Sequence, residues 1–252
     1  MTIAIPKYIE ERIRRATPAD SHVVPGSTPV VSFGNASIAT VATLGLNPSR
    51  VEFYRNGHEL VGESRRLATH RSLGTSDLTV APPDAVAQVL DDCNTYFLRN
   101  LYRRWFDQLE QVLDACGASY YDGSACHLDL VQWATDPTWG KLRPATVRRA
   151  LLAADAPFLI RQLQNENIRV LLVNGNAVMR QLQRIGNFEL QEVDGIIGFA
   201  HQDTRMFVGR MFDRVRVIGW STNIQSSFGV TTELRDELAE RVEELANETL
   251  VA

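Results

Sequence analysis

The chain of 252 residues has few cysteines, almost no lysine and no long apolar run. Its three cysteines are scattered without a CxxC pair, which argues against a disulfide framework, a zinc site of four thiolates and an iron–sulfur cluster. No stretch approaches the roughly 18 uninterrupted apolar residues of a membrane-spanning helix, and the N-terminus lacks the apolar core of a signal peptide. We therefore expect a cytoplasmic protein with no cofactor, no metal and no membrane partner. The cysteines, Cys93, Cys116 and Cys126, are expected to be small buried side chains.

Arginine supplies nearly all of the positive charge. Only Lys7 and Lys141 are lysines among 26 basic residues, so 24 are arginines. Arginine suits bidentate contact with phosphates and nucleobases, although biased codon usage would give the same composition. The net charge of −4 is not the overall signature of a nucleic-acid binder. If the chain binds DNA, a local patch of arginines must do so, and that binding must weaken strongly with salt.

The composition and the order of apolar segments indicate an α/β protein. A hydrophobic fraction of 44% with 22% charged residues is typical of a globular chain. Predicted strands alternate with predicted helices, which favours a three-layer α/β/α fold around a central, mostly parallel, four-stranded sheet. We expect a single domain over residues 1–252, with an N-terminal extension over 1–27 and a C-terminal helix over 231–252.

The predicted elements place four strand ends at one edge of the sheet, where sites lie in such folds. These ends are 45–53, 127–133, 174–176 and 220–228. The predicted strands are 28–33, 37–44, 119–130, 168–173 and 215–219, with a hairpin over 195–211. The predicted helices are 1–16, 94–116, 147–164 with a break at Pro157, a helix from the 174–176 turn to about 186, and the helix that starts at the Thr231–Thr232 cap.

The first strand end carries the most informative motif. Gly45-Leu46-Asn47-Pro48-Ser49 follows a buried apolar run, and Phe53 comes four residues after Ser49. Glycine permits a close turn and proline makes the next step rigid, so the Asn47 amide would be held at the mouth of the sheet. An amide there can hold a water molecule through its carbonyl oxygen. This segment resembles the first motif of the uracil-DNA glycosylase superfamily, whose mismatch-specific branch has asparagine and then proline after a similar strand.

The resemblance implies a monofunctional DNA glycosylase, which flips a base out of DNA and hydrolyses its bond to the sugar. Asn47 would be the catalytic residue that positions the attacking water. Phe53 would stack on the extruded base, and Gly45 would also contribute to base binding. The alternative is a turn that ends a strand, in which Asn47 caps its own backbone.

The second strand end, His127-Leu128-Asp129-Leu130, resembles the base-reading segment of the same superfamily. In that superfamily, an asparagine commonly occupies the position that Asp129 has here, and it reads the pyrimidine edge. A carboxylate only accepts hydrogen bonds, whereas an amide both donates and accepts. A carboxylate can accept from the exocyclic amine of cytosine but has no proton for O4 of uracil. Asp129 therefore favours a cytosine-type base, including modified cytosines; the alternative is a loop carboxylate in a salt bridge.

The last strand end departs from the superfamily, because residues 221–227 contain no His-Pro-Ser sequence. A polar loop that caps the C-terminal helix is the alternative explanation of this segment. The resemblance still implies roles for polar side chains here and elsewhere. These are Ser221 and Thr222 as catalytic donors to the departing base, Asn176 in base binding, and Ser49, Arg65, Arg66, Arg71, Asn223, Ile224 and Gln225 in DNA binding.

Three functions remain open from the sequence. The first is a glycosylase for a modified cytosine, such as one that attacks phage DNA in antiviral defence. The second is a repair glycosylase for uracil or another deaminated base. The third is a relative that binds DNA or a nucleotide without catalysis. DNA is the expected partner of a monomeric chain, and no P-loop, dinucleotide fingerprint or metal-ligand cluster indicates another enzyme class.

Overall fold

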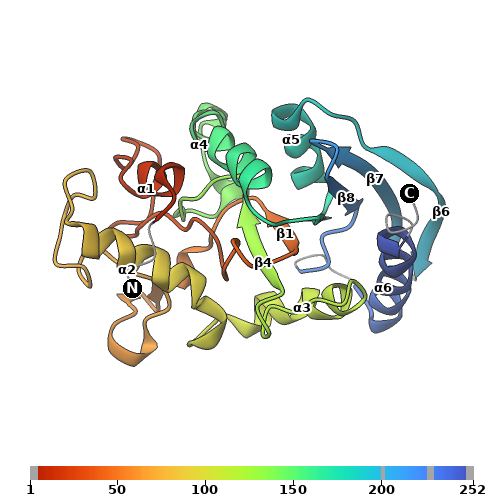
Figure 1. Cartoon of the computed structure of the whole chain (residues 1–252), viewed down its shortest axis with the longest axis horizontal. Coiled ribbons are helices and arrows are strands. Elements are labelled where there is room, and N and C mark those ends of the chain that lie inside the picture. The colour runs from red at the N-terminus through yellow and green to blue at the C-terminus, as the bar shows by residue number, and fades with distance from the viewer. Residues whose placement is uncertain (1–4, 200–201, 226–229, 248–252) are drawn as a thin grey trace. The chain divides into compact units, whose positions relative to one another are not determined.

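The structure is a computed structural model that describes residues 5–199, 202–225 and 230–247 (Figure 1). The chain forms two compact units, and each unit is built from segments that are separate in the sequence. The expectation of a single domain stays a prediction. Unit 1 comprises Met1–Gly34, Leu46–Leu101 and Asp129–Gln162, and unit 2 comprises Asn35–Gly45, Tyr102–Leu128 and Leu163–Ala252.

Unit 2 is organised around a six-stranded sheet, to which unit 1 contributes only the last residue of one strand. The strand order is β4-β1-β5-β8-β7-β6. The strands are β1 Val41–Gly45, β4 Ala125–Asp129, β5 Val170–Asn174, β6 Gln191–Phe199, β7 Gln202–Met211 and β8 Val215–Trp220.

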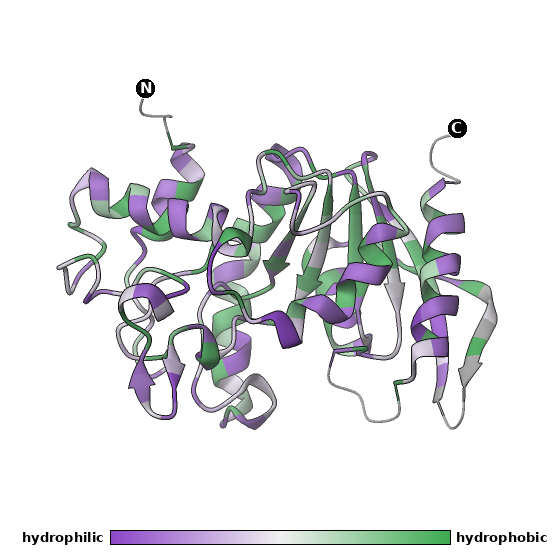
Figure 2. Ribbon diagram, turned by 90° about the horizontal axis from the view of Figure 1, so that it is seen from below, coloured by the Kyte–Doolittle hydropathy of each residue, from purple (hydrophilic) through white to green (hydrophobic). Residues whose placement is uncertain are grey.

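The centre of the sheet is parallel and almost wholly apolar. Strand β5 pairs in parallel with β1, with Val41 opposite Val170, and also with β8, where Asn174 lies opposite Trp220. Burial on both faces requires continuous apolar strands, and Figure 2 shows the central strands coloured largely as hydrophobic. The sequence prediction of a mostly parallel central sheet is confirmed.

The predicted number of four strands is wrong. Strand β7 pairs antiparallel with β8, and β6 pairs antiparallel with β7, so the hairpin extends the sheet by two strands. The two additional strands are 9 and 10 residues long. Their length lets the hairpin cover the free edge that β8 would otherwise expose.

Helices flank the sheet of unit 2. Helix α5, Asn176–Gly186, packs on β5, whereas α6, Thr232–Asn247, packs on α3, Arg103–Asp114, and contacts β6 and β8 (Figure 1). The predicted start of α6 is confirmed, because the Leu234 amide donates to the Thr231 hydroxyl at 3.3 Å.

Unit 1 has short helices and long irregular connections. Its long extended stretch over 28–33 pairs with the backbone beyond β4, where the Val30 amide donates to the Gln132 carbonyl at 2.8 Å. The predicted strand at 28–33 is therefore an extended segment outside the sheet. The elements are α1 Lys7–Ile13, η1 Arg50–Glu52, β2 Tyr54–Arg55, β3 His58–Glu59, η2 Gly62–Ser64, α2 Pro83–Asn94, η3 Tyr96–Leu98, η4 Trp139–Lys141 and most of α4 Ala145–Asn165.

Two predicted helices differ from the structure. The prediction of one helix over 94–116 is wrong, since α2 ends at Asn94 and α3 begins at Arg103. The buried rings of Tyr96 and Phe97 lie in the 3-10 turn between them, which separates the two helices. Helix α4 is continuous through Pro157, where a break was expected.

Within the described ranges, no helix has both the length and the apolar character needed to cross a bilayer.

A buried ion pair ties the N-terminal helix of unit 1 to the segment after β4. The Arg12 and Asp155 side chains are both 0% exposed, and Arg12 Nη2 lies 3.0 Å from Asp155 Oδ2. The same carboxylate oxygen accepts from the Gln132 amide at 2.9 Å, and Arg12 Nε donates to Gln132 Oε1 at 3.1 Å. Burial lowers the pKa of Arg12 to about 10 despite the attraction of Asp155. Arg12 stays charged near neutral pH, so Asp155 is the partner of a buried cation.

Replacing Asp155 with alanine should destabilise the fold strongly. The variant leaves the Arg12 charge buried and the Gln132 amide without its acceptor, a loss of about 3–5 kcal/mol. Urea denaturation followed by circular dichroism measures it. Glu11→Ala is the control, because it breaks an exposed pair with Arg161, and such pairs contribute about 1 kcal/mol or less. Equal losses in the two variants would contradict the importance of the buried pair.

Candidate functional site

The first motif forms a tight connection between β1 and the helical turn η1. Strand β1 ends at Gly45, and η1 begins after Ser49, whose hydroxyl accepts from the Val51 amide at 3.4 Å. Ser49 is exposed but its oxygen caps this turn. From Leu46 onward the motif belongs to unit 1, together with Asp129 and the segment that follows it.

The Asn47 amide is held by its nitrogen. Its Nδ2 lies 3.1 Å from each of three oxygens, those of the Pro48 carbonyl, the Trp133 carbonyl and the Thr135 hydroxyl. Two of these groups only accept, which determines the orientation of the amide. Among the described residues nothing donates to Asn47 Oδ1, so the half-buried side chain presents a vacant acceptor.

Two segments far apart in sequence run side by side in unit 1. The Val131 amide donates to the Leu46 carbonyl at 3.0 Å, and Ser49 bridges to Thr135. The contacts of Asn47 with Trp133 and Thr135 join the same segments. A turn that only caps itself is therefore not the role of Asn47, because its amide links residues 46–53 to residues 129–135.

Asp129 closes strand β4 and is 5% exposed. Its carbonyl accepts from Gln132 Nε2 at 2.7 Å, which folds the chain back immediately after the strand. Its carboxylate is near enough to Glu52 to raise the pKa of that group. The two strand ends that the sequence singled out as most informative are thus brought together.

Glu52 is a buried acid that the sequence interpretation missed. It is 2% exposed, and its Oε2 accepts from the Tyr96 hydroxyl at 2.6 Å and lies 3.6 Å from Arg66 Nη1. Burial raises its pKa to about 7, against the opposing effects of Tyr96 and Arg66 and with a further increase from Asp129. Its place beside Phe53, directly after the motif, was the available signal.

Phe53 is packed inside unit 1. The residue is only 1% exposed, so neither face of its ring is open to a ligand as the chain is folded here. Stacking on a nucleobase, the role implied by the resemblance, requires the side chains over the ring to move aside.

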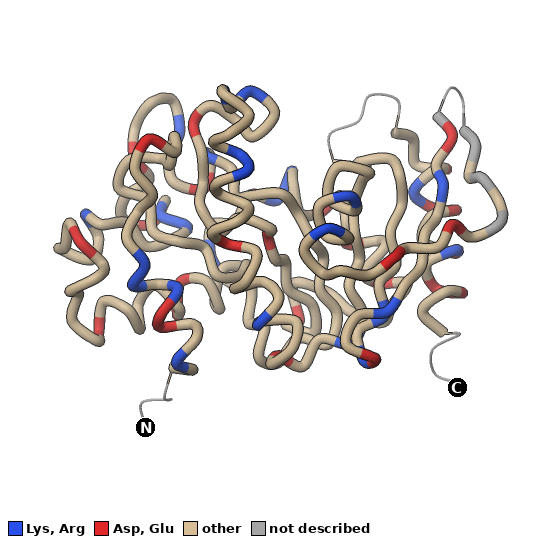
Figure 3. Tube along the Cα trace, turned by 90° about the horizontal axis from the view of Figure 1, so that it is seen from above, with Lys and Arg blue, Asp and Glu red and all other residues tan. Residues whose placement is uncertain are grey.

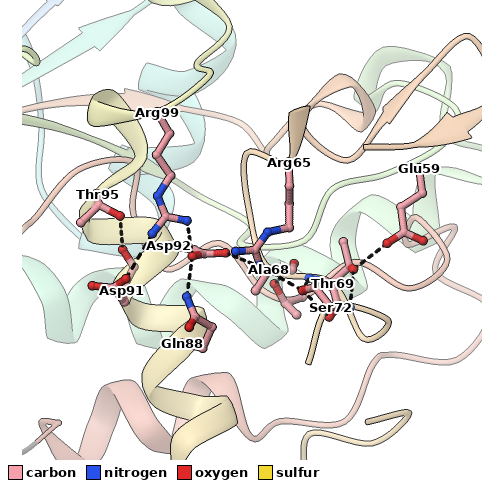
Figure 4. A network of polar contacts seen from close by, with 11 residues as sticks. Glu59, Arg65, Ala68, Thr69, Ser72, Gln88, Asp91, Asp92, Thr95 and Arg99 are labelled. Carbon is pink, nitrogen blue, oxygen red and sulfur yellow. Dashed lines mark hydrogen bonds and ion pairs between the residues drawn. The ribbon is translucent and has the colours of Figure 1, made fainter. Parts of the chain in front are cut away.

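Two of the three arginines predicted to bind DNA have internal partners. Arg65 Nη1 lies 3.0 Å from the buried Asp92 carboxylate and donates to the Ser72 hydroxyl at 3.0 Å (Figure 4). Arg66 is 5% exposed and donates to the Val51 carbonyl beside Glu52. Arg71 is exposed and has no ion pair among the described residues, so it remains the available phosphate contact of the three.

The Asp92 network explains why Arg65 is held. The carboxylate also accepts from Gln88 Nε2 at 2.8 Å and contacts Arg99, which reaches Asp91 as well (Figure 4). Because Asp92 is fully buried, releasing Arg65 to DNA would remove a partner from a buried charge.

In unit 2, Asn174 organises the segment after β8. Its Oδ1 accepts from Trp220 Nε1 at 2.9 Å and from the Ile224 amide at 3.0 Å. Its Nδ2 donates to Asn223 Oδ1 at 3.0 Å and to Gln225 Oε1 at 2.9 Å. One amide thus fixes the backbone and two side chains of this segment.

The polar side chains of this segment are only partly available. Gln225 donates to the Trp105 carbonyl, and Ile224 is 2% exposed, so neither is presented for insertion into DNA. The Ser221 hydroxyl accepts from the Arg205 amide, and Thr222 bonds to Thr204. Residues 226–229 of the predicted loop lie outside the described residues.

For two asparagines of unit 2, no acceptor for the side-chain amide nitrogen is found among the described residues. Asn223 accepts through Oδ1, and no described group accepts from its Nδ2. Asn176 is exposed at the start of α5, after Gly175, which has a φ of 96°. A Cβ on Gly175 would lie 3.2 Å from the Asn223 Cβ, so glycine permits this close approach.

Among the residues that the structure describes, the charged side chains are mixed in sign and form no metal site. Figure 3 shows basic and acidic residues interspersed along the chain. A hollow of about 430 Å³ in unit 2 is lined by three glutamates and one arginine, Arg241, all on α6, so its charged lining is mainly acidic. In the part of the chain that the structure describes, no cluster of three histidine, cysteine or acidic side chains is placed to bind a metal.

The prediction that the cysteines are buried holds for two of the three. Cys93 and Cys126 are buried and Cys116 is half-buried. Burial raises the pKa of both Cys93 and Cys126 to about 12, so these thiols stay protonated.

No protein-family model matches the chain, and neither does any curated protein.

Glu52→Gln should flatten the pH dependence of stability. The pKa of Glu52 rises from 4.5 to about 7 on folding, so the neutral acid stabilises the fold fully below about pH 4. That contribution, on the order of 3 kcal/mol, is lost as the pH rises through 7. Glutamine stays neutral, so the free energy of unfolding of the variant should gain on the wild type between about pH 5 and 8.

Urea denaturation at a series of pH values measures this difference. Glu63→Gln is the control, because Glu63 is exposed in η2. Curves that stay parallel for wild type and Glu52→Gln would contradict the titration of Glu52.

Proposed function

We propose that the chain is a DNA glycosylase that hydrolyses the bond between a pyrimidine and its sugar. The observation that carries the proposal is the Asn47 amide, which is fixed through its nitrogen and leaves its carbonyl oxygen vacant. A fixed, half-buried acceptor at the end of a sheet strand is suited to hold one water molecule in a constant direction. The α/β sheet with Asn47 at a strand end supports the same function.

The mechanism assigns Asn47 the role of orienting the nucleophile. A base inside a duplex must first leave the stack, at a cost of a few kcal/mol. The bond from C1′ to the base nitrogen then breaks, and its electron pair leaves with the base. Asn47 Oδ1 accepts a hydrogen bond from the water molecule. The water oxygen therefore faces C1′ and forms the new bond. The amide does not take the proton, which passes to the departing base or to solvent.

Asp129 supports a cytosine-type base as the substrate. It lies beside the Asn47 segment and is buried, so a base that reached it would lose its water and need a matching partner. A carboxylate accepts from the exocyclic amine of cytosine and repels O4 of uracil. Modified cytosines keep this amine, which makes phage DNA that carries them a suitable target.

The arginine contacts favour one competing function. Because Arg65 and Arg66 have internal partners, Arg71 alone of the three arginines predicted to bind DNA is left to hold a DNA backbone. A relative that binds a nucleotide without cleaving it would need fewer of them. Binding to DNA without the formation of abasic sites would support this second candidate.

Asn47→Ala should reduce excision by at least about 100-fold, because misplacement of a reactant commonly costs that much. Duplexes containing 5-hydroxymethylcytosine, its glucosylated form, uracil or hypoxanthine are scored for abasic sites by alkaline cleavage. Asn100→Ala is the matched control, because that exposed amide donates to the Ser64 carbonyl in the same unit. Full excision by Asn47→Ala would rule out the assigned role.

Asp129→Asn should shift base preference from cytosine-type bases toward uracil. The amide can donate to O4, so the ratio of the two excision rates should change by about ten- to 150-fold, the value of one mismatched edge contact. Asp84→Asn, an exposed position on α2, controls for the change of charge. An unchanged ratio would show that Asp129 does not read the base, and a wild type that prefers uracil would favour repair of deaminated DNA.

A further inference from the structure

One segment of unit 1 is an exception to the mixed charge of the chain. Residues 137–154 contain no acid and four basic residues, which are Lys141, Arg143, Arg148 and Arg149. The acids on either side have other partners, since Asp136 pairs with Arg50 at 3.2 Å and the buried Asp155 pairs with Arg12. Among the residues that the structure describes, no acidic side chain pairs with any of the four basic ones. The positive charge of this segment is therefore not neutralised locally.

Two of these guanidinium groups meet at one backbone oxygen. Arg143 Nη1 donates to the Leu142 carbonyl at 2.9 Å, and Arg148 Nη1 donates to the same oxygen at 3.0 Å. Because each nitrogen is about 3 Å from the shared oxygen, the two Nη1 atoms lie no more than about 6 Å apart. Two cations this close repel each other, and an anion that contacts both would offset the repulsion.

The backbone that holds this pair is fixed by the core of unit 1. Leu142 is 0% exposed and packs in one cluster with Trp133 and Leu151. The Trp133 carbonyl in turn accepts from Asn47 Nδ2 at 3.1 Å. The arginine pair and Asn47 are therefore connected through the packing of one tryptophan.

Most donors of the two guanidinium groups remain open. A guanidinium has five N–H donors, and only Nη1 of each arginine has a partner in the described part of the chain. Arg143 is exposed and Arg148 is half-buried, so both reach solvent. Arginine binds the oxygens of a phosphate in bidentate fashion, and two neighbouring guanidinium groups suit one phosphate.

We infer that Arg143 and Arg148 together bind one phosphate of the DNA backbone, while the exposed Lys141 and Arg149 add to the attraction. This inference rests on the proposed function, which makes DNA the ligand. A phosphate contact holds the strand in position but carries no sequence information. The pair should therefore strengthen binding to every duplex equally and leave the choice of base to other residues.

The test is equilibrium binding of short fluorescein-labelled duplexes, with Asn47→Ala as the background so that substrate is not consumed. Fluorescence anisotropy over a series of salt concentrations compares a duplex that contains 5-hydroxymethylcytosine with an unmodified one. In Arg143→Ala/Arg148→Ala, the affinity for both duplexes should fall roughly ten-fold or more at low salt. The slope of log affinity against log salt should become shallower by about 0.9, the contribution of one phosphate contact.

Two further double variants serve as controls. Arg161→Ala/Arg241→Ala removes the same charge from arginines that already pair with glutamates, so its slope should equal that of the background protein. Arg143→Lys/Arg148→Lys keeps the charge but loses the planar fork, so it should keep the slope and lose only part of the affinity.

An affinity loss with an unchanged slope would overturn the inference, because the two arginines would then only hold the Leu142 carbonyl. A larger effect on deoxycytidine monophosphate, measured by isothermal titration calorimetry, than on the duplexes would also overturn it, since the pair would then bind a free nucleotide. The proposed function is tested separately, by abasic-site formation with Asn47 intact. A shallower slope without excision by the wild type would reject catalysis alone, whereas excision with an unchanged slope would reject the arginine pair alone.

Discussion

The arrangement of unit 1 depends on a charge pair that water does not reach. Asp155 holds both the Arg12 guanidinium and the Gln132 amide, so one carboxylate sets the path of the chain after β4. That path brings the Trp133 carbonyl and the Thr135 hydroxyl to Asn47. Buried pairs gain little net energy, because desolvation offsets attraction, yet they penalise every other arrangement. The pair therefore acts mainly by excluding alternative positions of the segment that carries the site.

Three polar side chains of the candidate site have a common arrangement. In each, one polar atom of the amide or carboxyl group is hydrogen-bonded, and no partner for the other is found among the described residues. Asn47 is anchored by its nitrogen, Glu52 by one carboxyl oxygen, and Asn223 in unit 2 by its carbonyl oxygen. Because one end of the group is already held, binding a ligand at the other end costs little additional conformational entropy. Such pre-organisation is expected where a reaction needs fixed directions more than strong binding.

The sequence indicated the parallel centre of the sheet and the meeting of the first two strand ends, because both follow from apolar runs and from strand direction. It did not indicate that the hairpin would join the sheet, since pairing with β8 depends on tertiary contacts. Tyr96 and Phe97 fit the helical spacing of apolar residues in the sequence, although the chain turns there. The sequence therefore did not indicate the gap between α2 and α3. Arg65 and Arg66 resembled surface cations because nothing local shows that buried carboxylates lie opposite them. The burial of Glu52 was not predicted either, because it depends on tertiary contacts with Tyr96 and Arg66, although its place beside Phe53 was a signal in the sequence.

The buried basic residue of the Asp155 pair is an arginine, Arg12, and not a lysine. Burial lowers the pKa of Arg12 only to about 10, whereas the same loss of hydration would bring an ammonium group close to neutrality. A guanidinium in that position is a permanent cation over the whole range in which Glu52 gains or loses its proton. Arg12 therefore keeps its charge over the pH range in which Glu52, in the same unit, gains or loses its proton.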